Sequence, residues 1–558
     1  MNTDRSIKAT SNPTLEVPQD LPQWLLPTVL LGLSALAWSR RFILDDAFIS
    51  FRYARNLARG EGLVWNAGEW VEGYTNFAWT LWLSVAFYLD LDPILFSQIS
   101  GLGAFLLGLI ALWFAARAIM VERVPATVAV LLLGMTPTFS AYATGGLETS
   151  LQAALLTTAV ALALRIWRAG RATVSSAALL SCVLGLAVLT RMDSAAIGAW
   201  VGLAILVFVV RSSNAEAPPL RSVLLALMLP FSVLVGAWLW WKSEVYGELL
   251  PNTYYAKTGA DGSWERGLHF LWMYIRSSVL FPAALMALPG IWAAAKTRHG
   301  PALVGWCALA TWLTYVASVG GDFMEFRFLV AAMPLAVLLL VWTLWAAVRS
   351  PGLRALVVAS TLMGGLVHQT QFEGQDGVES IEQLASHLTH EVQDWKGVGE
   401  TLHGDLGAGS TARIATTAAG AIPYYSELPS VDMLGLTDAW VARHGKRVSL
   451  QVAHHRLAPL SYLVERDVHL VLGQPWIRRP ASPPRTHYPF PHLRELHALA
   501  GERARDFPRT ASILEIPLPN NRVLVALYLA PHKDVERAIA TAGWRRIPIR
   551  ASSPNAAL

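Results

Sequence analysis

The chain begins its first apolar run with LPQWLLPTVLLGLSALAW at residues 21–38, and residues 41–76 then read RFILDDAFISFRYARNLARGEGLVWNAGEWVEGYTN. The apolar run approaches the ~20 residues that a bilayer-spanning helix needs, so it predicts a first span. No small-residue cleavage pattern closes it, so we expect an uncleaved span rather than a signal peptide. The polar stretch behind it, which carries the acid pair Asp45 and Asp46, is then expected at a membrane edge.

Composition extends this interpretation to the whole chain. Of the 558 residues, 54% are hydrophobic and 15% charged, whereas a soluble domain carries about 25% charged residues. We predict a polytopic α-helical membrane protein with an N-terminal tail (1–21), a membrane module (22–370, catalytic loop 40–76) and a polar C-terminal domain (371–558). The net charge of +5 is small for this length. The lysines and arginines lie mostly at the ends of the expected helices, which is typical of membrane proteins and predicts no nucleic-acid partner.

Hydropathy predicts about eleven spans, or about twelve if the short apolar segment 76–90 also crosses. The candidate spans are 22–39, 96–116, 124–141, 148–164, 173–190, 194–210, 221–241, 278–295, 301–318, 328–347 and 354–368. If 76–90 does not cross, the arginine-bearing loops that follow it all fall on the cytoplasmic side. This topology predicts a multi-pass protein of a bacterial cytoplasmic membrane with its C-terminal domain outside.

The same topology brings five polar loops to the outer face. They are LDDAFISFRYAR (44–55), TGGLETS (144–150), TRMDS (190–194), EVYGELLPNTYYAK (244–257) and GGDFMEFRF (320–328). Paired acids and bases are costly near a bilayer unless they serve a site, so we predict one shared site there.

The acid pair and the motifs behind it carry a resemblance. The pair is followed by R-Y-x-x-N, G-x-G-x-V-x-N and E-G-Y-T-N, and later by GGLET, GGDFMEFRF and GAIPYYSELPSVDMLGLTD (420–438). In this order they resemble the GT-C superfamily of membrane glycosyltransferases that use polyprenyl-phosphate sugars, and most closely the terminal arabinofuranosyltransferases of the mycobacterial cell wall and their bacterial relatives.

The resemblance implies an inverting arabinofuranosyl- or hexosyltransferase. The donor is a polyprenyl-phosphate sugar and the acceptor a cell-envelope glycan, glycolipid or protein. A carboxylate must take the acceptor proton, and Asp45 is the first choice, with Asp46 in support. Cations must stabilise the departing phosphate. The expected substrate-binding residues are Arg52, Tyr53, Asn56, Glu72, Tyr74, Glu148, Arg191, Tyr254, Tyr255, Lys257, Asp322 and Arg327.

Several alternatives stay open. Asp46 could hold a divalent cation (Mg²⁺ or Mn²⁺) with Glu148 or Asp322, or bind a sugar hydroxyl; no compact metal motif is present. Arg55 and Arg59 are expected to be solvated or close to lipid headgroups. A membrane transporter or flippase, and a catalytically inactive envelope scaffold or regulator, are the competing functions.

The C-terminal domain alternates strand-like and helical patterns, which predicts an α/β fold. Strands are expected in ARIATT (412–417), SVDML (430–434), DVHLVLG (467–473) and RVLVALYLA (522–530), and a helix at 392–405. We expect this domain to bind the acceptor or cover the membrane site, with Tyr424, Tyr425 and Asp432 as contacts and with His454 and His455 as ordinary surface residues.

Overall fold

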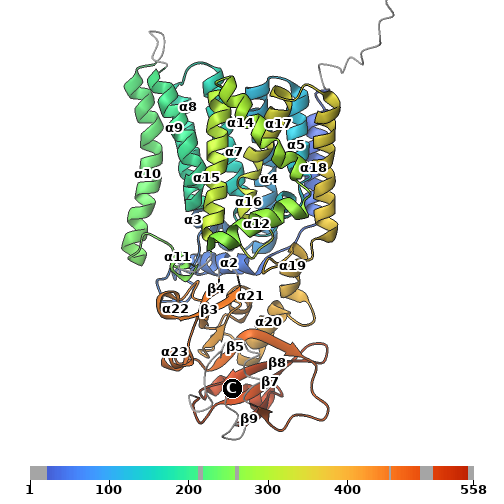
Figure 1. The fold of residues 1–558 in the computed structure, drawn as a ribbon. Coiled ribbons are helices and arrows are strands. Elements are labelled where there is room, and N and C mark those ends of the chain that lie inside the picture. Colours follow the sequence, from blue (N-terminus) through green and yellow to red (C-terminus); the bar gives the residue numbers. More distant parts are fainter. Residues whose placement is uncertain (1–21, 212–217, 258–262, 452–453, 490–506, 551–558) are drawn as a thin grey trace, which may run out of the picture.

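The computed structural model describes residues 22–211, 218–257, 263–451, 454–489 and 507–550. A helical bundle occupies one end of the molecule and an α/β unit the other, with the helix α2 lying between them (Figure 1). The bundle helices are α1 (Leu25–Ser39), α4 (Pro93–Met120), α5 (Arg123–Gly134), α6 (Pro137–Ala141), α7 (Thr149–Arg168), α8 (Val174–Thr190), α9 (Ala195–Arg211), α10 (Leu220–Tyr246), α12 (Ser263–Ser277), α13 (Phe281–Leu285), α14 (Ala287–Lys296), α15 (Gly300–Val319), α16 (Arg327–Val330), α17 (Met333–Ala346) and α18 (Pro351–Gln371).

Five described helical segments are long and apolar enough to cross a membrane: α4, α7, the short turn Met192–Ser194 continued by α9, α10 and α15. A sixth candidate is the segment formed by α12 and by α13 with α14, which is bent by 116°. Five further apolar helices of 10–17 residues, α1, α3, α5, α8 and α17, lie at positions where the sequence predicts apolar segments. The chain is therefore a helical membrane protein, and the count of about eleven spans stays a prediction.

Helix α3 (Phe77–Tyr88) starts and ends on the same side of the bundle. At its start, Asn76 contacts Ser50 of α2, and at its end Tyr88 donates to the carbonyl of Leu57 at the other end of α2. Twelve residues span about 18 Å, less than the ~30 Å of a bilayer core. The segment 76–90 therefore returns to the α2 side, as the charge pattern of the later loops requires.

Helix α2 (Asp45–Ala58) is buried along most of its length, from Ala47 to Asn56. Its side chain Phe48 packs 5.3 Å from the rings of Tyr424 and Tyr425 in the C-terminal unit. Both acids of the pair occupy its first turn, where carboxylates are favoured by the unpaired amides and the helix dipole. The sequence thus places the acid pair at the junction of the two units.

The C-terminal unit is built on a seven-stranded mixed sheet in the order β2-β1-β5-β8-β7-β9-β6. Strands β2, β1 and β5 are parallel, and β5, β8, β7 and β9 are antiparallel. The elements are α19 (Ile381–Thr389), α20 (Trp395–Leu406), β1 (Ile414–Thr416), α21 (Ala421–Ser426), β2 (Ser430–Asp432), α22 (Ala439–His444), β3 (Lys446–Gln451), β4 (His454–Leu457), α23 (Leu460–Glu465), β5 (Leu470–Arg478), β6 (Tyr488–Pro489), β7 (Ser512–Leu518), β8 (Arg522–Tyr528), α24 (Lys533–Thr541) and β9 (Arg545–Arg550). All four predicted strands and the predicted helix are present, as β1, β2, β5, β8 and α20.

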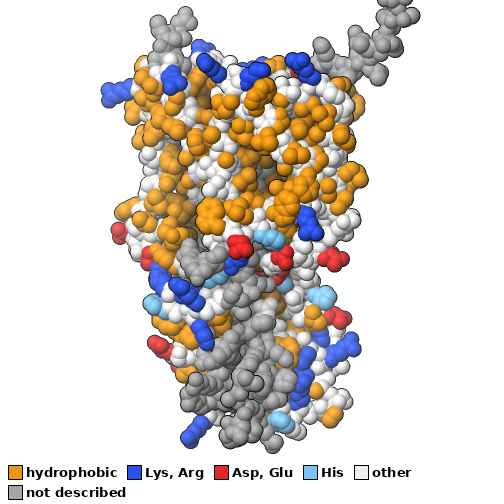
Figure 2. All heavy atoms as spheres, in the orientation of Figure 1, with side chains coloured by type: hydrophobic (Ala, Val, Ile, Leu, Met, Phe, Trp, Pro, Cys, Tyr) orange, Lys and Arg blue, Asp and Glu red, His pale blue; other side chains and the backbone are white. Residues whose placement is uncertain are grey.

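Charge is distributed unevenly along the molecule. On the face drawn, Figure 2 shows lysines and arginines at the end of the bundle remote from the C-terminal unit, while Asp, Glu and His gather where the two units meet. A hydrogen bond from Arg168 to the carbonyl of Arg117 joins two of the remote helix ends. The loops that the sequence assigns to the cytoplasm thus share one end of the bundle.

Candidate active site between the membrane module and the C-terminal domain

The acid pair makes two different sets of contacts. Asp45 accepts hydrogen bonds from the backbone amides of Ala421 (2.7 Å) and Gly420 (3.2 Å), so its carboxylate is held by the C-terminal domain. Burial raises the pKa of Asp45 to about 7, against the opposing effect of the Ala421 amide. Burial also raises the pKa of Asp46, although the cations Arg327 and Lys257 oppose it.

Both acids line a cavity of about 250 Å³ that we call the acid cavity. The membrane module contributes α2 and the loop 320–328, and the C-terminal domain contributes the rest of the wall. The polar and aromatic residues lining it are Asp45, Asp46, Phe323, Glu379, His387, Trp395, Thr417 and Gln474. His387 is hydrogen-bonded to Glu379 (2.7 Å) and stacks on Trp395 at 4.5 Å.

A second cavity, of about 340 Å³, is lined by three cations, and we call it the cation cavity. Arg191 comes from the end of α8, Lys257 from α11 (Asn252–Lys257) and Arg327 from the start of α16. Lys257 makes no hydrogen bond or ion pair within the described parts of the chain, and burial lowers its pKa although Asp322 opposes this. An unpaired, half-buried ammonium beside two guanidinium groups favours an anionic ligand.

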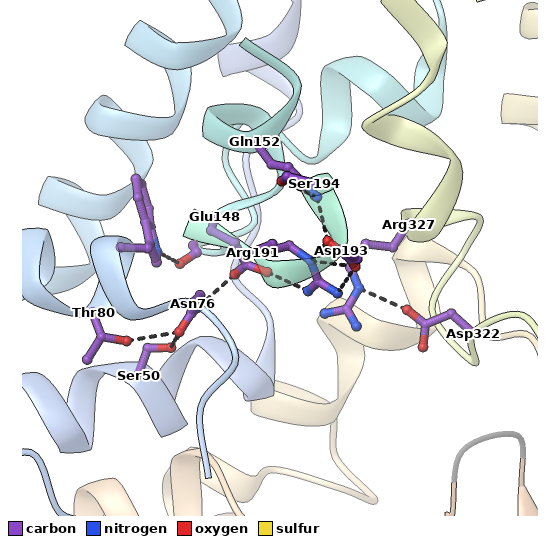
Figure 3. A network of polar contacts seen from close by, with 12 residues as sticks. Ser50, Asn76, Thr80, Glu148, Gln152, Arg191, Asp193, Ser194, Asp322 and Arg327 are labelled. Atoms are coloured by element: carbon purple, nitrogen blue, oxygen red, sulfur yellow. Dashed lines mark hydrogen bonds and ion pairs between the residues drawn. The ribbon is translucent and has the colours of Figure 1, made fainter. Parts of the chain in front are cut away.

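A network of acids and amides holds the two arginines in place (Figure 3). Glu148 accepts from Asn76 (2.7 Å) and from Arg191 (2.8 Å). Asp193 accepts from the Arg191 guanidinium at 2.6 Å and 3.1 Å. Asp322 accepts from Nε of Arg327 at 2.8 Å, and no described residue accepts from the other two guanidinium nitrogens of Arg327. The network orients Arg191 and Arg327 without using all their donors.

The loop 320–328 joins the two cavities. Its residues Phe323 and Met324 line the acid cavity, while Gly321 and Arg327 line the cation cavity. Asp46 is electrostatically coupled to Lys257 and Arg327 across this boundary. The structure therefore brings together the acid pair and all five polar loops that the sequence places at one face.

The motif residues behind the acid pair have a different place from the one predicted. Arg52 is 4% exposed, and its guanidinium donates to the backbone carbonyls of Trp65, Pro423 and Leu428. Asn56 donates to the carbonyl of Val64 at 2.8 Å. Arg52 lines neither cavity; its donors instead hold the loop 60–76 and dock the C-terminal domain.

Four more predicted contacts are also structural. Tyr53 donates to the carbonyl of Val71 (2.6 Å), and Tyr74 bonds the hydroxyl of Tyr246 (3.1 Å). Glu72 forms a buried ion pair with Lys242 of α10 at 2.6 Å, and Tyr255 donates to Glu248 at 2.9 Å. None of these four side chains lines either cavity. Of the two tyrosines predicted to contact substrate from the 244–257 loop, only Tyr254 lines the cation cavity.

The remaining charged residues of α2 are also paired. Arg55 contacts Glu427 at 2.9 Å and Arg59 contacts the same carboxylate at 3.1 Å. Arg55 is 9% exposed, so the expectation that it is solvated is wrong, whereas Arg59 is exposed as expected. Both arginines fasten α2 to the C-terminal domain through Glu427.

The acids suggested for a divalent cation do not fit such a site. Glu148 is occupied by Arg191 and Asn76, and Asp322 by Arg327. Within the described ranges no group of three or more His, Cys, Asp or Glu is placed to hold a metal ion. Hard cations need several free oxygen ligands, and here arginines occupy them.

The residues that the C-terminal domain contributes to the cavities were not predicted from the sequence. His387, Trp395, Thr417 and Gln474 line the acid cavity, and His455, expected to be an ordinary surface residue, lines the cation cavity. The predicted contacts Tyr424 and Tyr425 instead pack on Phe48, and Asp432 accepts from the amides of Leu434 and Thr437. No local pattern marks the lining residues, since they come from separate helices and strands. The prediction for the side chain of His454 lies outside the part of the chain that the structure describes.

The contact between Asp45 and Gly420 gives a direct test of domain docking. A Cβ at Gly420 would overlap the Asp45 carbonyl and lie 2.6 Å from its carboxylate Oδ2. We expect Gly420→Ala to lower the activity of the site about 10²-fold by displacing the acid, without lowering the unfolding temperature of the bundle. Gly404→Ala is the matched control, because a Cβ there meets nothing within 4 Å; equal activity of the two variants would contradict this role of the contact.

The chain is similar to two curated proteins, both described as terminal beta-(1->2)-arabinofuranosyltransferase. It is 31% identical to the Mycobacterium tuberculosis protein over 291 residues (48% of this chain, 43% of that protein). It is 28% identical to the Corynebacterium glutamicum protein over 359 residues (57% of this chain, 50% of that protein). The chain thus spans about half the length of the curated relatives it matches.

The fold is similar to that of a solved structure. ArnT from Cupriavidus metallidurans, crystallised with undecaprenyl phosphate, superimposes with a TM-score of 0.54 at 14% identity, covering 90% of this chain and 98% of ArnT. A family model described as a domain of unknown function (DUF8728) matches residues 383–512. The resemblance drawn from the motifs is confirmed, since both curated relatives are described as arabinofuranosyltransferases, and the fold is similar to that of ArnT.

Proposed function

We propose that the chain is an inverting membrane glycosyltransferase that moves a sugar from a polyprenyl-phosphate donor to a cell-envelope acceptor. The observation that carries the proposal is the junction of the two cavities: an acid with a raised pKa faces one, and three cations line the other. The curated relatives support arabinofuranose as the sugar. ArnT's bound undecaprenyl phosphate supports a lipid phosphate as the carrier.

In the proposed reaction Asp45 acts as the general base. Its carboxylate takes the proton of an acceptor hydroxyl as that oxygen attacks the anomeric carbon. The bond between the anomeric carbon and the phosphate oxygen breaks, and its electron pair stays on the phosphate. Arg191, Lys257 and Arg327 stabilise the added negative charge. One displacement inverts the anomeric configuration.

The lipid chain of the donor has an apolar path beside the cation cavity. The C-terminal end of α15 and the turn Met192–Ser194, which leads into α9, line the cation cavity. Helices α9 and α15 also line an apolar cavity of about 590 Å³. Its lining includes Ile197, Val201 and Ile205 of α9 and Gly305 and Ala308 of α15. We assign this cavity to the polyprenyl chain, because it is apolar and its helix α9 follows directly on the turn that lines the cation cavity.

The orientation is part of the same proposal. Basic residues of a membrane protein concentrate in cytoplasmic loops, and here they gather at the end remote from the C-terminal domain (Figure 2). We therefore place the active site outside the bacterial cytoplasmic membrane. A cysteine introduced at the exposed residue Lys446 should react with an impermeant reagent in intact cells; reaction only after permeabilisation would reverse the orientation.

The test of the activity is transfer from a panel of labelled decaprenyl-phosphate sugars carrying arabinofuranose, mannose or glucose. We expect product only with one sugar, with inverted anomeric configuration by NMR. No transfer from any of these donors to envelope acceptors would favour the inactive scaffold. The transporter is less well supported, because the charged residues described above cluster at the junction rather than midway along spans.

A further inference from the structure

We infer that Glu325 is a positioning residue of the candidate active site, because it ties the loop 320–328 to the bundle helix α18 and to the first turn of α19, and so holds Arg327 at the cation cavity. The inference rests on the proposed function, since Arg327 is one of the three cations assigned there to the departing phosphate. Glu325 itself lines neither cavity. It therefore acts through the loop that carries it and not by touching a substrate.

Both oxygens of the buried Glu325 carboxylate contact groups from distant parts of the chain. Glu325 is 5% exposed. Its Oε1 lies 2.9 Å from Nε2 of His368 in α18, and its Oε2 accepts a hydrogen bond of 2.8 Å from the backbone amide of Ile381, the first residue of α19. Amides at the start of a helix lack partners within it, and a carboxylate is a favoured acceptor for them. The carboxylate thus joins the bundle to the C-terminal domain between the end of α18 and α19 (Figure 1).

His368 is itself held in place. It is 2% exposed, and its Nδ1 lies 3.1 Å from Oγ of Ser277 at the end of α12. Its ring stacks on that of Phe372, with 4.9 Å between the ring centroids. A buried imidazole that is bonded at both nitrogens and packed on one face has little freedom to turn. Glu325 is therefore attached to a fixed point of the bundle, and its backbone carbonyl accepts a further hydrogen bond of 3.1 Å from the hydroxyl of Tyr142.

The backbone of the next residue, Phe326, is strained. Phe326 has φ +47° and ψ +24°, which is the left-handed region that a bulky side chain rarely adopts. Its ring is fully buried between α12 and α18, with its centroid 4.9 Å from that of Tyr274 and 5.3 Å from that of Phe372. Strained conformations persist only where their surroundings hold them, and they concentrate at functional sites. Here the anchored Glu325 carboxylate and the packed Phe326 ring hold the turn, and α16 begins with Arg327 directly after it.

The place of Arg327 depends on this turn. Asp322 orients the guanidinium through the 2.8 Å contact with its Nε (Figure 3). Because Asp322 belongs to the same loop, this contact cannot fix the loop relative to α8 and α11, which supply Arg191 and Lys257. The contacts of Glu325 with α18 and α19 can fix it, because both helices lie outside the loop.

A second link joins the loop to the same stretch in front of α19. The backbone amide of Glu379 donates to the carbonyl of Phe323 (2.7 Å), and Glu379 also forms a short parallel bridge with Met324. Glu379 lies only two residues before Ile381, so the two links reinforce one another. The start of the C-terminal domain thereby helps to place a cation of the membrane module.

The test compares Glu325→Ala and Glu325→Gln with a matched control, in full-length protein in nanodiscs. Alanine removes both contacts, whereas glutamine keeps an oxygen for the Ile381 amide and an amide group that can bond His368. The control is Glu382→Ala, because Glu382 is an exposed acid in the same turn of α19.

The first measurement is transfer from labelled decaprenyl-phosphate arabinofuranose. We expect Glu325→Ala to lower kcat about 10²-fold, the loss that a misplacement of about 1 Å causes. Binding of polyprenyl phosphate should fall much less, because Arg327 acts on charge that the phosphate gains only as the bond breaks. Glu325→Gln should stay within about fivefold of wild type, since at most one hydrogen bond is lost. Glu382→Ala should match wild type.

A double variant tests whether Glu325 acts through Arg327. If it does, adding Glu325→Ala to Arg327→Gln should lower kcat no further than Arg327→Gln alone, whereas independent losses multiply. Multiplied losses, a wild-type kcat in Glu325→Ala, or equal losses in the alanine and glutamine variants of Glu325 would overturn the inference.

Hydrogen–deuterium exchange tests the position of the loop without relying on transfer. We expect the backbone amides of residues 320–330 to exchange about tenfold faster in Glu325→Ala and at the wild-type rate in Glu382→Ala. Unchanged exchange in Glu325→Ala would overturn the inference whatever the activity. If wild-type protein transfers none of the tested sugars while exchange follows the expected pattern, the proposed function fails and the placement of the loop by Glu325 stands. If Glu325→Ala does not fold, His368→Ala breaks the same contact from α18 and is judged by the same measurements.

Discussion

Replacing Asp45 by asparagine is expected to lower kcat for sugar transfer by about 10²–10⁴, the range that a positioned general base contributes. The amide cannot take the acceptor proton, yet it has nearly the shape of the carboxylate. Binding of polyprenyl phosphate should be unchanged, because Asp45 lines the acid cavity and not the cation cavity. The measurement is single-turnover transfer with the donor that wild-type protein uses.

The same assignment predicts how activity depends on pH. A base works only when deprotonated, and burial raises the pKa of Asp45 to about 7. We therefore expect kcat/KM of wild-type protein to rise with pH through an inflection near 7 and to fall away below it. Asp46 helps to raise this pKa through its charge, after burial and against the Ala421 amide. Asp46→Asn should accordingly move the inflection to lower pH while leaving substantial activity.

Comparison of Asp45→Asn with Asp46→Asn shows which of the two acids is the general base. If Asp46→Asn abolishes transfer and Asp45→Asn only reduces it, the roles of the pair are exchanged. Asp45→Asn also replaces one acceptor of the Gly420 and Ala421 amides with a donor, which can disturb domain docking. Gly420→Ala disturbs the same contact with the acid intact. Because the Gly420 and Ala421 amides lower the pKa of Asp45, this variant should move the inflection to higher pH and not abolish it.

The parts of the site predicted from the sequence are those carried by local pattern and charge. Arginine-rich loops fixed which ends of the helices share a face, and that was enough to bring Asp45, Glu148, Arg191 and Arg327 to one region. The alternation of strand-like and helical sequence patterns in the C-terminal domain likewise predicted four of its strands. Both signals depend on near neighbours in the sequence, which is why they can be read from a single chain.

The motif behind the acid pair shows where such prediction ends. Arg52, Tyr53 and Asn56 have the chemistry of substrate contacts, but their partners are mostly backbone groups of the loop 60–76 and of the C-terminal domain. The side chain of Asn66 is a further partner of Arg52. A backbone carbonyl leaves no trace in the sequence, so a guanidinium that folds a loop cannot be told from one that binds phosphate. The same limit hid His387 and Gln474, which meet Asp45 from more than 300 residues away.

The second large effect is expected at Lys257. Its ammonium lines the cation cavity and has no partner in the parts of the chain that the structure describes, whereas Arg191 and Arg327 are held by acids. Lys257→Gln therefore removes a charge without leaving a carboxylate unpaired. Loss of one charge-stabilising donor lowers kcat by about 10²–10³, and we expect transfer to fall by this amount with the unfolding temperature unchanged.

The contrast with Arg327 sharpens this prediction. Arg327→Gln removes a charge from the same cavity but leaves Asp322 buried at 1% exposure without its partner, so it should also lower the unfolding temperature. Lys533→Gln, at an exposed residue of α24, is the control for loss of a lysine charge. If Lys257 stabilises the departing phosphate, its variant should lose more in kcat than in polyprenyl phosphate binding, since the phosphate gains charge only as the bond breaks. A loss confined to binding would make Lys257 an anchor of the donor, and the stabilisation of the leaving group would then rest on Arg191 and Arg327.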